Sequence, residues 1–263
     1  DDYLPSVVSE CTYNDHIISV AQFDSGLAFW ANKSMLENAG VRIPADYKDA
    51  WDKVEFEDAL KKLKDSGVEW PIYVRQNKPS TEYYTWMPFV ASFGGDYMNR
   101  ETGLCTGTLD GDNTIASFDF LAKLFTDGYA DATCDYEDSF QKGENALALY
   151  GHSKYQDYKA ALGDDLILVP LPDMGHGVYT CSGSTVMIMT TGAQESGNDD
   201  AVWAMLQEAT NPDYIKMVVD VNGAVPARSS VMDAIPDYCE GGTLYLYRQQ
   251  LESGISFPVS YTH

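Results

Sequence analysis

Two stretches of the chain place apolar residues at the spacing of an amphipathic helix. Over residues 55–66 the apolar side chains share one helical face, and Gly67 supplies a stop signal: Phe56, Ala59, Leu60 and Leu63. Over residues 114–126 a similar stripe recurs: Ile115, Phe118, Leu121, Leu124 and Phe125. We expect both segments to be helices with these side chains turned toward a core.

Further helices and strands alternate along the chain. Helices are expected over 83–93, where aromatic residues end at Gly94-Gly95, and over 198–209 and 212–221, separated by Asn211-Pro212. Short apolar runs indicate strands at 70–74, 146–150, 166–169 and 185–190. This alternation predicts an α/β layer architecture.

The segment 22–40 combines three signals in close succession. An extended apolar run containing Gly26 beside Asp24 leads into a short helix over 33–39. Asn32 can cap the start of that helix, and Gly40 can close its end. The pattern indicates a strand that bends at a flexible point and then leads into a docked helix.

This segment resembles the first crossover between lobes in the extracellular solute-binding proteins of sugar ABC transporters, the maltose-binding-protein-like family. Ala31 stands where that family usually has tyrosine. The segments 140–151 and 222–228 are similar to two later blocks of the family, the second being its return crossover with Pro226-Ala227-Arg228. Three matches in the family's order cover almost the whole chain.

The resemblance implies an α/β fold of the periplasmic-binding-protein-like type II class, with two lobes joined by hinge crossovers. The second lobe would span 27–179 and be completed by 229–263, whereas 1–26 and 180–228 would supply the rest of the first lobe and the hinge segments. Because Asp1 falls late in the family's first lobe and His263 falls before its final helices, the resemblance also implies a fragment with an incomplete first lobe.

Composition narrows the possible partners. Acidic residues outnumber basic ones 40 to 17, which gives a net charge of −23 and makes nucleic acid or an anionic membrane an unfavourable partner. A solvated acidic surface is the simplest interpretation of that charge. The sequence contains no apolar run of membrane-spanning length and no basic-then-apolar leader.

The cysteines do not suggest a metal site. The five residues lack CxxC or Cys/His spacing: Cys11, Cys105, Cys134, Cys181 and Cys239. Cys105 with Cys134 is the favoured disulfide in an exported protein, and five unpaired thiols are the alternative. Metal and cofactor are therefore not expected.

Aromatic residues, at 13% of the chain, can supply flat apolar faces for pyranose rings. Tyr83, Tyr84 and Trp86 lie together at a helix start and are similar to the family's aromatic platform. The alternative is that these rings belong to the helix's core stripe.

Polar candidates lie at the expected crossovers. Asp24 and Ser25 can accept or donate hydrogen bonds with sugar hydroxyls, although a turn aspartate can instead bind its own backbone. Gly151 follows a predicted strand, where the family has a glycine and, shortly after it, a tryptophan. No tryptophan stands at 152 or 153 in this chain, which leaves His152 as a candidate partner for a sugar hydroxyl. The segment 175–184 is expected to be a second crossover, where Ser182 and Gly183 offer groups. Arg228 can bind adjacent hydroxyls or form a salt bridge across the lobes.

No GxSxG, HExxH or phosphate-binding glycine loop is present. In agreement with the absence of these motifs, the resemblance implies a component of an ABC transporter that is not an enzyme. This component would capture a sugar or short oligosaccharide by hinge closure. Its partners would be the sugar and the permease subunits, and the full-length protein would be a monomer in the periplasm or lipid-anchored on the cell surface. The rivals are a secreted glycoside hydrolase and a binder of a polyamine or metal complex with the same fold.

Overall fold

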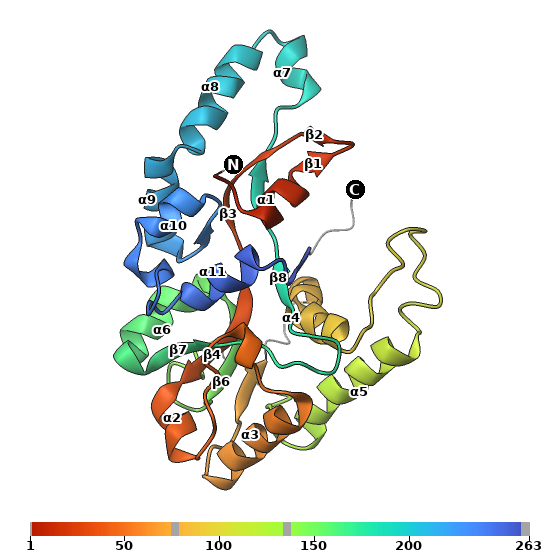
Figure 1. The fold of residues 1–263 in the computed structure, drawn as a ribbon, viewed down its shortest axis with the longest axis vertical. Coiled ribbons are helices and arrows are strands. Elements are labelled where there is room, and N and C mark those ends of the chain that lie inside the picture. Colours follow the sequence, from red (N-terminus) through yellow and green to blue (C-terminus); the bar gives the residue numbers. More distant parts are fainter. Residues whose placement is uncertain (1, 75–78, 134–137, 259–263) are drawn as a thin grey trace.

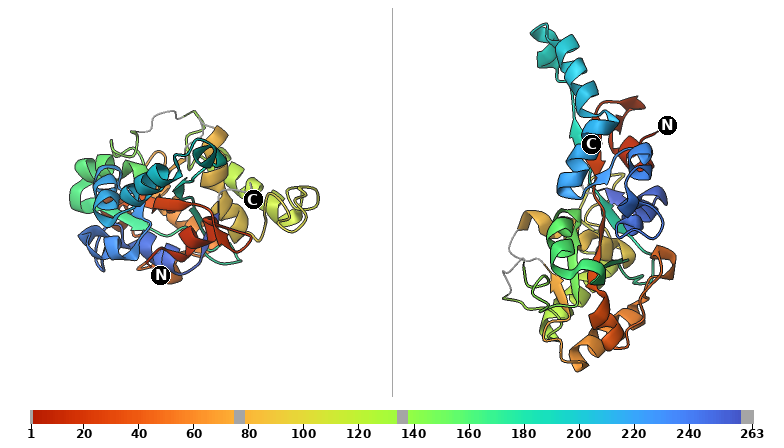
Figure 2. Two further views of the ribbon diagram at one scale, coloured as in Figure 1. Left: turned by 90° about the horizontal axis from the view of Figure 1, so that it is seen from above. Right: turned by 90° about the vertical axis from the view of Figure 1, so that its left-hand side faces the viewer.

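The computed structural model describes residues 2–74, 79–133 and 138–258, with side chains omitted also for 79–83, 257 and 258. The molecule is elongated, with a four-stranded sheet and the helices around it in its lower half and a helical arm, residues 191–209, at the top (Figure 1). The same arm projects from the body in the perpendicular view (Figure 2).

A four-stranded sheet forms the centre of the lower half, in the order β5-β6-β4-β7. Its strands are β4 (Leu27–Asn32), β5 (Ile72–Val74), β6 (Leu147–Gly151) and β7 (Leu166–Val169). β4 pairs antiparallel with β6 and β7, and β5 pairs parallel with β6. Since residues 27–31 are all fully buried, both faces of β4 are covered.

Helices cover this sheet. They are α2 (Lys33–Asn38), α3 (Lys53–Asp65), α4 (Pro79–Ser92), α5 (Asp112–Thr126) and α6 (Tyr155–Leu162). Short 3-10 turns lie at Tyr47–Asp49, His152–Lys154, Gly163–Asp165 and Pro236–Tyr238. One core joins α3, α4 and α5 to the sheet through stacked and tilted rings of Phe29, Phe56, Phe89 and Phe120.

The upper half is built on a smaller sheet in the order β10-β3-β9. Its strands are β3 (Val20–Asp24), β9 (Thr185–Met187) and β10 (Val225–Pro226). Helices α7 (Thr191–Glu195) and α8 (Asp199–Ala209) form the arm, and α9 (Pro212–Asn222) lies against β3 and β10 of the sheet. A hairpin of β1 (Thr12–Tyr13) and β2 (His16–Ile17) turns through Asn14 and Asp15, both at positive φ.

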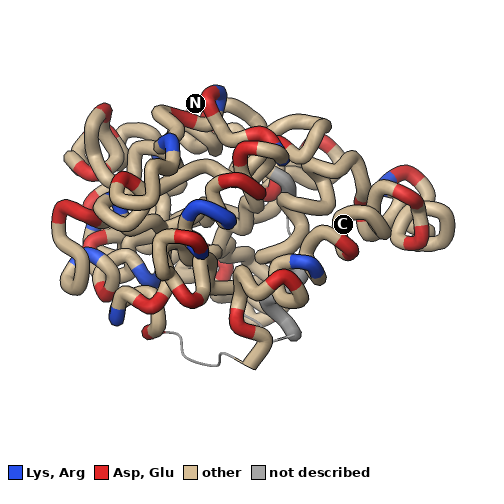
Figure 3. The backbone as a smooth tube through the Cα atoms, turned by 90° about the horizontal axis from the view of Figure 1, so that it is seen from below, with Lys and Arg blue, Asp and Glu red and all other residues tan. Residues whose placement is uncertain are grey.

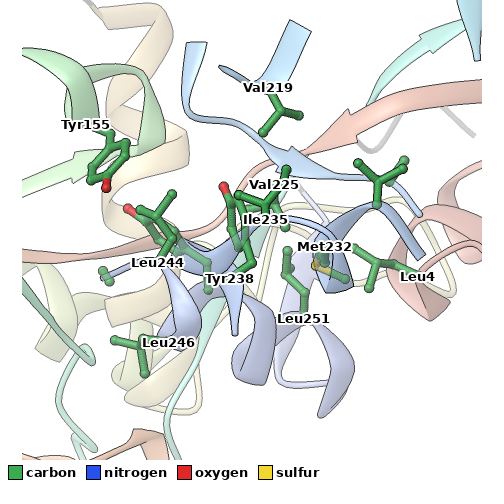
Figure 4. Close-up of a cluster of buried hydrophobic side chains, with 14 of the residues drawn as sticks. Leu4, Tyr155, Val219, Val225, Met232, Ile235, Tyr238, Leu244, Leu246 and Leu251 are labelled. Atoms are coloured by element: carbon green, nitrogen blue, oxygen red, sulfur yellow. The ribbon is translucent and has the colours of Figure 1, made fainter. Parts of the chain in front are cut away.

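The two halves meet around α1 (Pro5–Glu10), α10 (Ser229–Asp233), α11 (Tyr245–Glu252) and the parallel pair of β8 (Thr180–Ser182) with β11 (Ser256–Pro258). A second core fills this junction, and Figure 4 shows part of it, including Leu4, Val225, Tyr238 and Leu251. Trp30 of β4 belongs to the same core and meets the ring of Tyr247 edge-on. The Tyr247 side chain of α11 thus packs against the lower sheet.

Most predicted elements are confirmed within a few residues. The Asn32 side chain caps α2 by accepting from the Met35 amide, as expected. All four residues of the predicted α3 face are buried. The predicted α5 stripe is wrong at Ile115, which is 47% exposed, because the buried face runs instead through Thr114, Ser117 and Phe120 with Leu121 and Leu124.

Charge and cysteines complete the description. Acidic residues are spread over the whole backbone seen in Figure 3 and do not gather at one place. Cys11 and Cys181 are buried free thiols, and Cys105 is an exposed one. The predicted pairing of Cys105 with Cys134 involves a residue outside the described part of the chain.

Candidate functional site

Two crossovers run side by side between the halves of the molecule. The first leads from β3 to β4 through residues 24–27, and the second leads from β8 to β9 through 182–185. The Leu27 amide donates to Thr180 Oγ1 at 2.8 Å, and that hydroxyl donates to the Leu27 carbonyl at 2.7 Å. Ser25 Oγ donates to the Gly183 carbonyl at 2.8 Å. These bonds tie the crossovers into a two-stranded connection.

Asp24 lies at the centre of this connection and is 0% exposed. Its Oδ1 accepts from the amides of Ser25 at 2.7 Å and Gly183 at 2.9 Å, and its Oδ2 accepts from Ser6 Oγ at 2.7 Å. Burial raises the pKa of this carboxyl to about 6, against the lowering effect of the Ser6 hydrogen bond. The geometry favours the backbone-binding interpretation of Asp24 over contact with a sugar.

Ser182 and Gly183 are likewise turned toward protein groups. Ser182 Oγ donates to Glu10 Oε1 at 2.8 Å, and the Ser184 amide donates to Glu10 Oε2 at 2.9 Å. Gly183 is held by Asp24 and Ser25 as described above. No role for Glu10 could be predicted from the sequence, because its partners Ser182 and Ser184 lie more than 170 positions away along the chain.

Gly26 is required by close packing at the first crossover. A Cβ atom at this position would lie 2.5 Å from Cδ1 of Tyr247, inside the van der Waals contact distance. From the other direction, the Tyr84 hydroxyl donates to the Gly26 carbonyl at 3.0 Å. The backbone carbonyl of Tyr84 accepts from Cys181 Sγ at 3.0 Å, so α4 contacts the chain at both crossovers.

A cavity of about 170 Å³ opens beside the first crossover. Four of the predicted site residues line it: Ser25, Tyr84, Gly151 and His152. Leu27, Thr85, Leu149, Tyr150 and Ser153 complete the lining among the described residues. A Cβ at Gly151 would lie 3.4 Å from the Tyr84 hydroxyl oxygen, in ordinary van der Waals contact.

His152 joins the cavity to α9. Its Nδ1 lies 3.3 Å from the Asn222 carbonyl oxygen, and its ring meets the Phe23 ring edge-on at 5.9 Å between centroids. Because a carbonyl only accepts, this contact needs the proton on Nδ1. Burial lowers the pKa of the imidazole and favours its neutral form, in which Nε2 is an acceptor.

The remaining predicted residues are not among those that line the cavity. Trp86 packs against Phe118 and the lower core, and its indole Nε1 is buried with no hydrogen-bond partner within the described ranges. Arg228 pairs with Asp2 at 3.3 Å and lies over the Tyr3 ring. This pair forms within the predicted first lobe. The side chain of Tyr83 lies outside the described residues.

A larger cavity of about 750 Å³ lies elsewhere, between α2, the loop after α3 and the segment before β6. Trp70, Glu69 and Glu144 are among its lining residues. None of the crossover residues lines it. We take the smaller cavity as the candidate site because it alone of the two adjoins the connection between the halves, where a change in their arrangement would alter its shape.

Among the described residues, no group of three or more His, Cys, Asp or Glu side chains is placed to hold a metal ion. Nor does that part of the chain contain a helix long and apolar enough to cross a bilayer.

Comparison with known proteins gives a consistent result. Residues 1–239 match the sequence profile of a family described as bacterial extracellular solute-binding protein. A search of curated protein sequences gives no significant match.

Solved structures share the fold. The GacH receptor of Streptomyces glaucescens, solved unliganded and with acarbose, aligns over 99% of this chain at 20% identity and a TM-score of 0.78. Maltose-bound MalE3 of T. maritima aligns over 98% at 19% identity and 0.77. The sugar-binding protein MalE of Xanthomonas citri aligns over 98% at 16% identity and 0.75. The chain spans 65%, 66% and 64% of these proteins, respectively.

Proposed function

The chain belongs to the bacterial extracellular solute-binding protein family, and we propose that it captures a neutral sugar or short oligosaccharide for an ABC transporter. The proposed site is the cavity beside the crossovers, with Ser25, Tyr84, Gly151 and His152 as ligand-contacting residues.

One observation carries this proposal. The described lining of the cavity contains hydroxyl groups, an imidazole, aromatic rings and a glycine, but no Lys, Arg, Asp or Glu. Such a surface suits an uncharged ligand that has hydroxyl groups on its edges and C–H groups on its faces. The neutral tautomer of His152 would accept a hydroxyl proton through Nε2, and Ser25 Oγ would accept another while donating to Gly183.

The proposed mechanism is hinge closure. We divide the chain into one lobe of 27–179 with 229–263 and a second formed by 1–26 and 180–228, joined at the crossovers. A ligand that contacts both lobes only in the closed form shifts the population toward that form. His152 suits this role because it lines the cavity on one lobe and contacts Asn222 and Phe23 of the other.

Permease subunits are the proposed partners, with a monomeric binding protein delivering the sugar. The family description gives an extracellular setting. Attachment to the membrane through a lipid is our proposal for how the protein stays near its permease.

Two other activities predict different ligand chemistry. A glycoside hydrolase would cleave an oligosaccharide and needs a pair of carboxyl groups facing the bond, which the described cavity lining lacks. A polyamine binder would need carboxylates for the cationic nitrogens, and the same lining offers none. The proposal is therefore a binding protein without enzymatic activity.

A thermal-shift panel tests the ligand class. Maltose, maltotetraose and acarbose are compared with glycerophosphocholine and spermidine at millimolar concentration, and chromatography checks each oligosaccharide for cleavage. We expect at least one neutral sugar to raise the melting temperature without being hydrolysed. Stabilisation by spermidine alone, or cleavage of the oligosaccharide, would contradict the proposal.

Calorimetry with the stabilising sugar then tests the site. His152→Ala removes an acceptor in the cavity, whereas His16→Ala changes an exposed histidine of β2 outside the cavity lining. We expect weaker binding for the first variant and wild-type binding for the second. Equal affinities in both variants would remove His152 from the site.

A further inference from the structure

We propose that Glu10 and Asp24 act as positioning residues. Their two carboxylates, called the clamp below, bind residues 182–184 of the second crossover and hold this segment beside the cavity. The hydrogen bonds to Asp24 are stronger when its carboxyl is ionised. The idea that this crossover is part of a hinge rests on the proposed function. The clamp itself is a property of the chain without ligand.

The clamp engages three consecutive residues of the second crossover. Ser182 donates through its hydroxyl to Glu10, Gly183 through its amide to Asp24, and Ser184 through its amide to Glu10. The three distances lie between 2.8 and 2.9 Å. Two carboxylates from the N-terminal segment therefore hold this turn, and hydrogen bonds to ionised acceptors are stronger than neutral ones.

α1 brings the two carboxylates together. Glu10 is its last residue, and Ser6, one turn earlier, donates to Asp24 Oδ2 at 2.7 Å. Val7 on the same helix is buried in the junction core. The helix is thus anchored by packing while its polar side chains contact both crossovers.

The groups around Asp24 set its response to pH. Glu10 on α1 is a second acid close enough to raise its pKa, and Cys11 after α1 and Tyr84 on α4 are further titratable neighbours. Ser6 and the amides of Ser25 and Gly183 favour the ionised form, whereas burial opposes it and dominates. The paired residues of β10 and β9 nearest to it, Val225, Pro226 and Thr185, carry no titratable group.

Protonation changes the hydrogen bonding of the clamp. The ionised carboxylate accepts from all three donors on two oxygens, but the protonated carboxyl has one oxygen that must donate. With the proton on Oδ2 and donated to Ser6 Oγ, Oδ1 still accepts from both amides, but as a neutral oxygen, so these two bonds weaken. Since Gly183 and Ser25 share Oδ1, the local hold on the second crossover weakens in mildly acidic solution while Asp24 stays buried. The stability of the whole fold responds in the opposite sense, because protonation removes a buried charge.

Amide proton–nitrogen correlation spectra of the whole chain without sugar, recorded between pH 4.5 and 7.5, test the proposal. We expect the Gly183 and Ser25 amide resonances to shift with one common midpoint near pH 6, the value to which the Asp24 pKa is raised. The protection of the Gly183 amide against hydrogen exchange should fall roughly fivefold below the midpoint, as for the change from a charged to a neutral acceptor.

Three variants separate the clamp from a general pH effect. Asp24→Asn reproduces the protonated arrangement, with Oδ1 accepting from the two amides and Nδ2 donating to Ser6, so its Gly183 amide should show the weaker protection at every pH and lose the titration. Glu10→Gln removes the neighbouring charge and should lower the midpoint, whereas Glu195→Gln, an exposed acid on α7, should leave it unchanged.

A flat Gly183 resonance in wild-type protein would overturn the proposal. So would a titration that persists in Asp24→Asn, or an equal midpoint in Glu10→Gln and Glu195→Gln. Because no sugar is used, these outcomes are independent of whether the chain binds one, which the calorimetry above decides.

Discussion

The hydroxyl of Tyr84 donates a hydrogen bond to the carbonyl oxygen of Gly26 across 3.0 Å. This bond joins α4 to the first crossover at the point where the Tyr247 ring packs against Gly26 from another side. Tyr84 also lines the cavity, so the same side chain is available to a ligand and bound to the connection between the halves. Ligand contact and crossover geometry are therefore linked through one residue.

Tyr84→Phe should retain the ring and lose this hydrogen bond. We expect the free energy of unfolding to fall by about 0.5–1.5 kcal/mol, the range for a neutral hydrogen bond. Urea denaturation measures the change, and Tyr13→Phe in the exposed hairpin provides the control. Equal stability of the two variants would show that the Tyr84 hydroxyl does not hold the crossover.

Gly26→Ala should be destabilising because its new Cβ meets the Tyr247 ring at 2.5 Å. Forcing a methyl group into a packed site typically costs about 1–3 kcal/mol. Gly192→Ala in helix α7 is the matched control, since a Cβ there would lie 3.6 Å from its nearest neighbour, Thr190 Oγ1. A melting temperature of Gly26→Ala equal to or higher than that of Gly192→Ala would contradict the close packing at Gly26.

Trp86→Ala should affect stability more than ligand binding. The indole packs against Phe118 and the lower core and is absent from the cavity lining. Removing it should lower the free energy of unfolding by roughly 3 kcal/mol, as for large aromatic residues in cores. If calorimetry instead shows lost sugar affinity with unchanged stability of the free protein, Trp86 belongs to a stacking platform.

Asp24→Asn should change the dependence of stability on pH. The folded-state pKa of Asp24 is raised from 3.8 to about 6, so between these values the folded protein binds more protons than the unfolded chain. The favourable contribution is complete below pH 3.8 and is lost as the pH rises through 6.

An asparagine side chain does not titrate, so the Asp24→Asn variant does not lose stability as the pH rises through 6. Relative to wild type it should gain roughly 2–3 kcal/mol of stability when the pH rises from below 4 to above 7. Urea denaturation at both ends of that interval measures the gain. A stability difference that stays constant with pH would mean that Asp24 has an ordinary pKa in the folded protein.

Local patterns in the sequence predict much of the fold. The Asn32 cap and the buried face of α3 depend on neighbours within a few positions, and both are confirmed. The predicted α5 stripe is wrong only at Ile115, because aromatic residues occur on more than one side of that helix, and packing against Phe56 and Phe89 selects Phe120 over Ile115. Helices α1, α6 and α11 are short and escaped prediction.

The candidate site was predictable only in part. Sequence motifs predict crossovers and candidate residues, and the fold places four of those residues around one cavity: Ser25, Tyr84, Gly151 and His152. The motifs do not show which polar groups at a crossover face the protein. Asp24 and Ser182 are engaged by Ser6 and Glu10 of α1, and such partners can be found only when the chain is folded.

The most direct test of the account is to map which backbone amides respond to sugar. Amide correlation spectra of the wild-type chain are recorded during titration with maltotetraose and with acarbose. We predict shifts concentrated at Ser25, Gly151, His152 and Ser153, around the crossover cavity. Shifts concentrated instead at residues 66–70 and 143–145, which line the larger cavity, would contradict the central claim that the crossover cavity is the ligand site.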